Sequence, residues 1–213
     1  ERDFPEFDSP MSPTHRVGGE PIDHFEKVKH SIKQWSFDNV FNLKELQEWE
    51  ERNLTLLKKE GIEEKPTYVA ELKIDGLKIV LTYKDGVLVR GATRGNGEIG
   101  EDITENIKTF RSIPLSLPEP VSITVIGEAW MKKKDLERIN KEREENELPL
   151  YANTRNLAAG TLRQLDPRIV ATRNLQLFAY DIEGGKHRTQ EEELKALSSY
   201  GFLVNKDHKY CAS

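Results

Sequence analysis

With 213 residues, of which 36% are hydrophobic and 32% charged, the chain is long enough for one sizeable domain. Its apolar residues recur in periodic runs, which predicts a folded domain. A net charge of −5 excludes a globally basic protein, so any contact with nucleic acid must come from a local basic patch. The single cysteine, Cys211, excludes a disulfide framework, and no apolar run predicts a signal peptide or a membrane span.

The first 60 residues predict an extended lead-in and then two helical stretches. Residues 1–22 contain several prolines and the pair Gly18-Gly19, and they begin without an initiator methionine, which indicates a looped segment of a longer protein. Two helical stripes follow between residues 21 and 60: Phe25, Val28 and Ile32, and then Leu43, Leu46, Trp49, Leu54 and Leu57. Asn42 is the predicted N-cap of the second helix and Gly61 its stop.

Residues 67–94 predict strands. The runs TYVAELKI, LKIVLTY and VLVRGAT are apolar and alternating, and the turn KDG at Lys84–Gly86 is a strong hairpin signal between the last two. The glycine-rich turn RGNGEIG follows. Asp102 and Glu105 then have the spacing of a capping box for a short helix.

The second half of the chain mixes strands and helices without a regular alternation. We predict strands over 121–130 and 174–183, and helices over 132–147, 156–165 (ended by Asp166-Pro167) and 189–201. Such an order favours an α+β fold with largely antiparallel sheets flanked by helices.

The stretch AELKIDGLKI, residues 70–79, combines charges in an unusual way. Read as a strand, it places Glu71, Lys73 and Asp75 on one face. A lysine amine is nucleophilic only when neutral, and its ordinary pKa of about 10.4 keeps it protonated at pH 7. Two acids alone would favour the charged form, so a nucleophilic role requires burial, a nearby cation or another task for the acids. An exposed face of alternating charges is the simpler alternative.

Other residues favour nucleotide chemistry. Arg94 lies in the glycine-rich turn, Glu128 is an isolated acid in an apolar strand, and Arg155 and Arg163 belong to one predicted helix. Glycines in the 91–100 stretch would let backbone approach a ligand closely. An amine nucleophile, cations for phosphates, and acids for ribose hydroxyls or a metal together suit nucleotidyl transfer.

The four-residue motif Lys73-Ile74-Asp75-Gly76 resembles the K-x-D-G motif of covalent nucleotidyltransferases: DNA ligases, RNA ligases and capping enzymes. Three longer strings resemble bacterial NAD-dependent DNA ligases far more specifically: SPTHRVGG, the run from AELKIDG to FRSIPLSL, and ANTRNLAAGTLRQLDPR. The resemblance runs from about Pro5 to about Asn205. It implies the fold of a DNA ligase adenylation domain.

The resemblance also implies a reaction and its residues. Lys73 would attack the α-phosphorus of NAD, release nicotinamide mononucleotide and form lysyl-AMP. The AMP would pass to the 5′-phosphate of a nick in double-stranded DNA, which the 3′-hydroxyl then seals, with Mg²⁺ offsetting phosphate charge. Glu71 matches the family's adenine contact, Arg94 the residue near the ribose and phosphates, and Glu128 the ribose contact. Asp75 would position Lys73 or a metal.

Ser36 and Phe37 occupy the place where the family reads P-M-L-S-L-D-N and this chain reads SIKQWSFDN. The serine and the D-N pair match, so backbone contacts to adenine are expected there, whereas Phe37 and residues 32–35 depart from the pattern. Arg155 and Arg163 resemble the arginines of the family's N-x-R-N helix. They would contact phosphates of the nucleotide or of nicked DNA, or serve a structural role. Three tryptophans are expected in the core rather than stacked on bases: Trp35, Trp49 and Trp130.

By this resemblance, residues 1–213 are an incomplete adenylation domain. Residues 1–22 would lead in from a missing helical domain, and two phosphate-binding lysine motifs are expected after residue 213. We therefore expect a monomeric, cytoplasmic fragment with no metal ligands of its own, since the family's zinc belongs to the missing C-terminal part. The fragment is not expected to seal nicks.

Two alternatives remain open at this point. An RNA ligase or a capping-type enzyme would share K-x-D-G but take AMP or GMP from ATP or GTP. A non-catalytic DNA-binding module would bind nicks in a salt-sensitive way without forming any adenylate.

Overall fold

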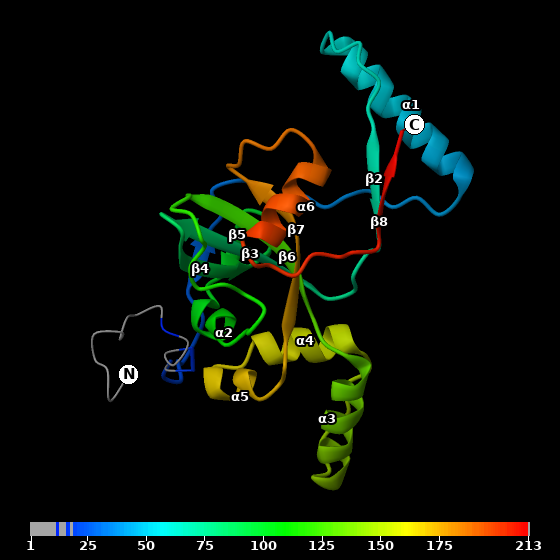
Figure 1. The fold of residues 1–213 in the computed structure, drawn as a ribbon. Coiled ribbons are helices and arrows are strands. Elements are labelled where there is room, and N and C mark those ends of the chain that lie inside the picture. Colours follow the sequence, from blue (N-terminus) through cyan, green and yellow to red (C-terminus); the bar gives the residue numbers. More distant parts are fainter. Residues whose placement is uncertain (1–11, 13–15, 18, 213) are drawn as a thin grey trace.

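The computed structural model describes residues 12, 16, 17 and 19–212. Figure 1 shows a central antiparallel sheet with helices around it. Its strand order is β4-β3-β6-β7, and its members are β3 (Leu77–Lys84), β4 (Val87–Thr93), β6 (Ile123–Trp130) and β7 (Gln176–Glu183). Two smaller antiparallel sheets pair β1 (Lys27–Lys29) with β5 (Ile99–Glu101) and β2 (Tyr68–Glu71) with β8 (His208–Cys211). The predicted α+β class with antiparallel sheets is confirmed.

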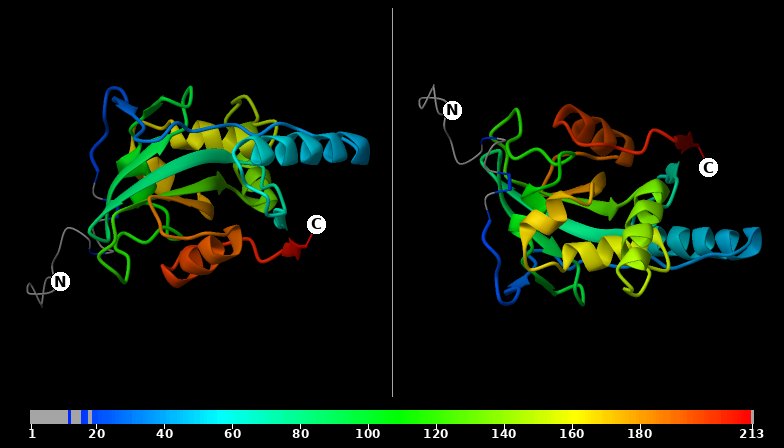
Figure 2. Two further views of the ribbon diagram at one scale, coloured as in Figure 1. Left: turned by 90° about the horizontal axis from the view of Figure 1, so that it is seen from above. Right: turned by 90° about the horizontal axis from the view of Figure 1, so that it is seen from below.

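The described helices are α1 (Leu43–Lys59), α2 (Thr104–Lys108), α3 (Lys133–Glu145), α4 (Thr154–Leu162), α5 (Pro167–Ala171) and α6 (Gln190–Ser199). Figure 2 shows α4 and α6 on opposite sides of the central sheet, while α1 extends away from it. The core joins the sheet to helices α2 to α6 through fully buried side chains such as Ile79, Val125 and Leu157, whereas α1 has no buried residue. None of the helices in the described part of the chain combines the length and apolar character needed to cross a bilayer.

The predictions that rest on interactions between neighbouring residues are confirmed for one hairpin turn and for both ends of α1. The predicted hairpin joins β3 to β4, and Asp85 and Gly86 adopt the positive φ angles of 48° and 79° that such a turn requires. The Asn42 side chain accepts a hydrogen bond from the Glu45 backbone N–H and caps α1, as predicted. Gly61, with φ of 74°, follows the end of that helix.

The helix predicted from the first stripe, Phe25, Val28 and Ile32, is wrong. This stretch contains only the short strand β1 and irregular backbone. Its polar groups are paired with the 97–101 region instead, since the His30 N–H donates to Glu98 O at 2.9 Å and the Gln34 N–H to Gly97 O at 2.7 Å. The lead-in predicted for residues 1–22 falls mostly outside the described residues.

Three further features of the fold differ from the prediction. The strand that was to carry Lys73 and Asp75 ends at Glu71, so those two residues lie in the loop before β3. Strands β5 and β8 were not predicted, because both are short and pair with distant partners. Asp166 caps a new helix, α5, rather than only ending α4.

The capping box at α2 and the core tryptophans also differ from expectation. Asp102 accepts hydrogen bonds from both the backbone N–H and the hydroxyl of Thr104, and Glu105 instead pairs with Lys108 at 2.7 Å. Trp35 is 66% exposed, so its predicted core position is wrong. Trp130 stacks on Phe178 at 5.1 Å between ring centroids, and Trp49 contacts Tyr68 at 5.8 Å.

Asn106 provides a test of how the helices are joined. Its side chain is 2% exposed and donates to the carbonyls of Leu162 and Gln164 at 2.8 and 2.9 Å, which ties α2 to the end of α4. Asn106→Leu leaves two interior carbonyls unpaired, so we expect the free energy of unfolding to fall by about 2–4 kcal/mol in urea titrations. In Asn146→Leu, an exposed control that loses a bond to the Glu142 carbonyl, water replaces the donor and the change should stay within about 0.5 kcal/mol. Equal losses in both variants would contradict this account.

Candidate active site

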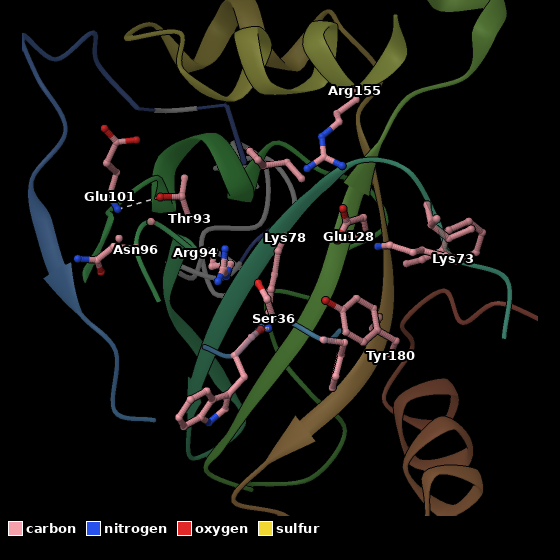
Figure 3. A pocket seen from close by; sticks show the side chains of 18 of the residues that line it. Ser36, Lys73, Lys78, Thr93, Arg94, Asn96, Glu101, Glu128, Arg155 and Tyr180 are labelled. Atoms are coloured by element: carbon pink, nitrogen blue, oxygen red, sulfur yellow. Dashed lines mark hydrogen bonds between the residues drawn. The ribbon is translucent and has the colours of Figure 1, made fainter. Parts of the chain in front are cut away.

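A pocket of about 960 Å³ opens over the central sheet, and Figure 3 shows the side chains around it. It draws on the 35–39 segment, the loop after β2, the turn after β4, strands β6 and β7, and helix α4. Every predicted site residue except Asp75 lines this pocket: Ser36, Phe37, Glu71, Lys73, Arg94, Glu128, Arg155 and Arg163.

Strand register explains why residues far apart in the chain meet on the pocket floor. Lys78 of β3 pairs with Glu128 of β6, and Glu128 pairs in turn with Phe178 of β7. Directly opposed residues of antiparallel strands point to the same face of the sheet. Arg94 follows Thr93, which pairs with Ile79, so the turn after β4 brings its guanidinium to the same place.

The loop that carries Lys73 is fixed by Gly76. A Cβ at Gly76 would lie 2.1 Å from the carbonyl oxygen of Ala129 and 3.0 Å from Cγ of Glu128, so the backbone there touches β6 directly. The Gly76 backbone also favours the ionised Glu128 carboxylate and so opposes the rise of its pKa. The glycine of the K-x-D-G motif therefore anchors the Lys73 loop on the strand that supplies Glu128.

Glu128 is the most enclosed charge of the site, with 9% of its surface exposed. Burial raises the pKa of its carboxyl group, and the nearby charges of Lys73 and Arg155 oppose that rise. Figure 3 shows the amine end of Lys73 turned toward Glu128, with Arg155 reaching in from α4. Asp75 is outside the pocket and forms an exposed ion pair with Arg155 at 3.0 Å, so it helps to orient that arginine.

Glu71 is held from the far side of the pocket. Gln190 donates a hydrogen bond to the Glu71 carboxylate at 3.1 Å and another to the Tyr180 carbonyl at 2.6 Å. The carboxylate is thus placed next to β7, where Phe178 and Tyr180 supply aromatic surface to the same pocket. This combination of an acceptor edge and aromatic faces can bind a nucleobase.

The sequence analysis did not single out several residues that line the pocket, among them Lys78, Phe178 and Tyr180. Lys78 lies between Arg94 and Glu128 in Figure 3, and burial lowers the pKa of its amine. The period of two along LKIVLTY could have indicated that Lys78 points away from the core residue Ile79. No comparable signal marks Tyr180, because it lies at a register shift between β6 and β7. Ile126 of β6 pairs with Asp181 and the next residue, Gly127, pairs with Ala179, so Tyr180 is passed over.

Arg155 and Arg163 lie on or just after α4, and both are exposed. They place two cations at the mouth of the pocket, where a phosphate or a second anionic molecule could be met. In the described part of the chain, no three or more His, Cys, Asp or Glu side chains cluster as a metal site would need.

Comparisons with known proteins agree with this geometry. The profile of the family described as NAD-dependent DNA ligase adenylation domain matches residues 22–213. A DNA ligase of Brevibacillus brevis is 48% identical over 212 residues, which is 98% of this chain, and one of Thermotoga petrophila is 49% identical over 214 residues, or 99%. A DNA ligase of Caldicellulosiruptor saccharolyticus is 46% identical over 215 residues. The chain spans 30–31% of the length of these three relatives.

Proposed function

The chain belongs to the family of NAD-dependent DNA ligase adenylation domains, and from this premise we propose that it is the nucleotide-activating part of a DNA ligase. The single observation that carries the proposal is the meeting of Lys73, Glu128, Arg94 and Arg155 in one pocket. A nucleophile, an acid for hydroxyl groups and cations for phosphates are thereby preorganised around a volume that suits a nucleotide.

In the proposed first step, the neutral amine of Lys73 attacks the α-phosphorus of NAD. A phosphorus–nitrogen bond forms, the phosphoanhydride bond breaks, and nicotinamide mononucleotide leaves with the bonding electrons while the amine loses its proton. Arg94 would stabilise the charge that develops on the phosphate oxygens. Glu71 would accept from the adenine amino group, and Glu128 would accept from a ribose hydroxyl.

Mg²⁺ would supply further offset of phosphate charge when bound. The side chains of the site would supply only a minority of the ligands of such an ion. This fits Mg²⁺, which is commonly held by one or two carboxylates together with substrate phosphates and water. Glu128, whose carboxylate interacts with the charge of Lys73, is a pocket carboxylate that could contribute.

The later steps are proposed for the parent protein rather than for these 213 residues. AMP would pass from Lys73 to the 5′-phosphate of nicked DNA, and the 3′-hydroxyl would then seal the strand. Arg155 and Arg163 at the pocket mouth would contact DNA phosphates without reading sequence. We propose that the protein is cytoplasmic, where it would meet that DNA. We also propose that these 213 residues form only part of the adenylation domain.

Intact-mass spectrometry with peptide mapping tests the proposal. This chain, and a version carrying the sequence that flanks it in its gene, would be incubated with Mg²⁺ and either NAD or ATP. We expect one AMP on Lys73 of the longer version, from NAD only, and little or none on the short chain. AMP taken from ATP instead would favour the RNA ligase or capping-type alternative. Nick binding without any adenylate would favour a non-catalytic DNA-binding module.

A further inference from the structure

Residues 30–37 form a strap, a segment without helix or strand that crosses beside the pocket and supplies Trp35, Ser36 and Phe37 to its lining. The strap lies directly on the glycine-rich turn. Gly97, with φ of 96°, permits this close approach, because a Cβ at that position would lie only 2.8 Å from the Gln34 carbonyl oxygen. This is also the stretch in which the sequence departs from the family's P-M-L-S-L pattern.

Gln34 joins the strap to the central sheet. Its side chain is 2% exposed, and its amide nitrogen donates to the two carboxylate oxygens of Glu183 at 3.1 and 3.3 Å. Glu183 is the last residue of β7 and is 149 positions away in the sequence. Hydrogen bonds from an amide to a carboxylate are stronger than those between neutral groups, and burial increases the cost of breaking them.

Two cations of the pocket floor hold the strap by its backbone. Arg94 donates from Nε to the Gln34 carbonyl at 3.3 Å, and Lys78 donates from Nζ to the Trp35 carbonyl at 3.4 Å. Since both cations also line the pocket, the strap and these two pocket cations belong to one connected network.

The strap ends in aromatic side chains that are largely exposed, although the Lys33 amine lies over the Trp35 ring at 4.8 Å from its centroid. Trp35 and Phe37 are 66% and 86% exposed, yet both line the pocket opposite a wall that contains Phe178 and Tyr180. Aromatic surface left exposed beside a pocket is typical of a binding site.

We infer that Gln34, Glu183 and Lys78 are positioning residues that fasten the strap, so that Ser36 and Phe37 close over the base of the bound adenine nucleotide. The inference rests on the proposed function for the identity of the ligand, whereas the fastening itself can be tested without any nucleotide. None of the three residues lies in the K-x-D-G motif. Their effect should therefore appear in the recognition of the base rather than in the attack by Lys73.

The first test uses hydrogen exchange of the ligand-free protein at pH 8. Gln34→Glu places two carboxylates in contact, and their repulsion should release the strap and speed exchange of the amides of residues 30–37 by about tenfold or more. Combining it with Glu183→Gln restores an amide–carboxylate pair in the reverse direction and should restore slow exchange. Gln47→Glu, an exposed site on α1, adds the same charge elsewhere and serves as the control. Unchanged exchange in Gln34→Glu would overturn the fastening.

The second test compares AMP with ribose 5-phosphate, which lacks the base. We expect Gln34→Glu to weaken AMP binding about tenfold, or about 1.4 kcal/mol, and to leave ribose 5-phosphate within about twofold. The double variant should recover AMP affinity. Equal loss for both ligands would overturn the role in base recognition. Failure of the unsubstituted longer version to bind AMP, with exchange of the strap behaving as expected, would contradict the proposed function without affecting the inference that the strap is fastened.

Discussion

Lys73→Met is expected to reduce AMP transfer from NAD by at least about 10⁴-fold in the version of the chain that carries its flanking sequence, because removal of a nucleophile eliminates the covalent route altogether. Lys73 is exposed and lies in a loop, so the substitution removes no core packing. The free energy of unfolding should remain within about 0.5 kcal/mol of the unsubstituted value. Quench-flow measurement of radiolabelled AMP on the protein provides the rate.

Two companion variants separate the nucleophile from its charge. Lys73→Arg keeps a cation at the site but offers no neutral amine near pH 7, so it should be as inactive as Lys73→Met. Lys141→Met removes a lysine from the exposed face of α3 and should transfer AMP at the normal rate. Substantial transfer by Lys73→Arg, or AMP mapped to another residue in Lys73→Met, would show that a different group is the nucleophile.

The parts of the fold that sequence predicted are those fixed by neighbours along the chain. Asp85-Gly86 specifies its own turn through positive φ angles, and Asn42 caps the helix that begins one residue later. By contrast, β2 and β8 form a sheet from residues about 140 positions apart, with Tyr68 opposite Cys211. The run that contains β2 was predicted as a strand, but β8 is too short to show a period, so only the folded chain reveals the pairing.

The same distinction between contacts of chain neighbours and contacts of distant segments applies to the site. Lys73 and Gly76 are adjacent in a short motif and could be recognised together, whereas the Gln34–Glu183 pair joins two segments with no local signature. The stripe of Phe25, Val28 and Ile32 misled the prediction, because its apolar residues serve a strand and a loop instead of a helix face. Backbone bonds from the strap to residues 97 and 98 take the place of helical ones there.

Gly76→Ala is expected to give the second largest effect, through placement of Lys73 rather than loss of it. The added methyl group would need to lie 2.1 Å from the Ala129 carbonyl oxygen, so the loop must move away from β6. Overpacking of this kind costs about 1–3 kcal/mol of unfolding free energy. A shift of about 1 Å in a reacting group can cost about 100-fold in rate, so we expect AMP transfer to fall by about that factor.

The two effects of Gly76→Ala can be told apart by measuring binding beside turnover. The base contacts expected from Glu71 and from the aromatic residues of β7 come from other elements, so AMP affinity should fall by less than about tenfold while kcat falls by about 100-fold. Gly185→Ala is a matched control, because its added methyl group would meet side-chain atoms rather than backbone: the His187 ring at 2.8 Å, which can move, and Cγ2 of Ile182 at 3.2 Å. If kcat is retained in Gly76→Ala, the contact between this glycine and β6 does not position the nucleophile, and the conformation of the Lys73 loop must be set by other contacts, among them the ion pair between Asp75 and Arg155.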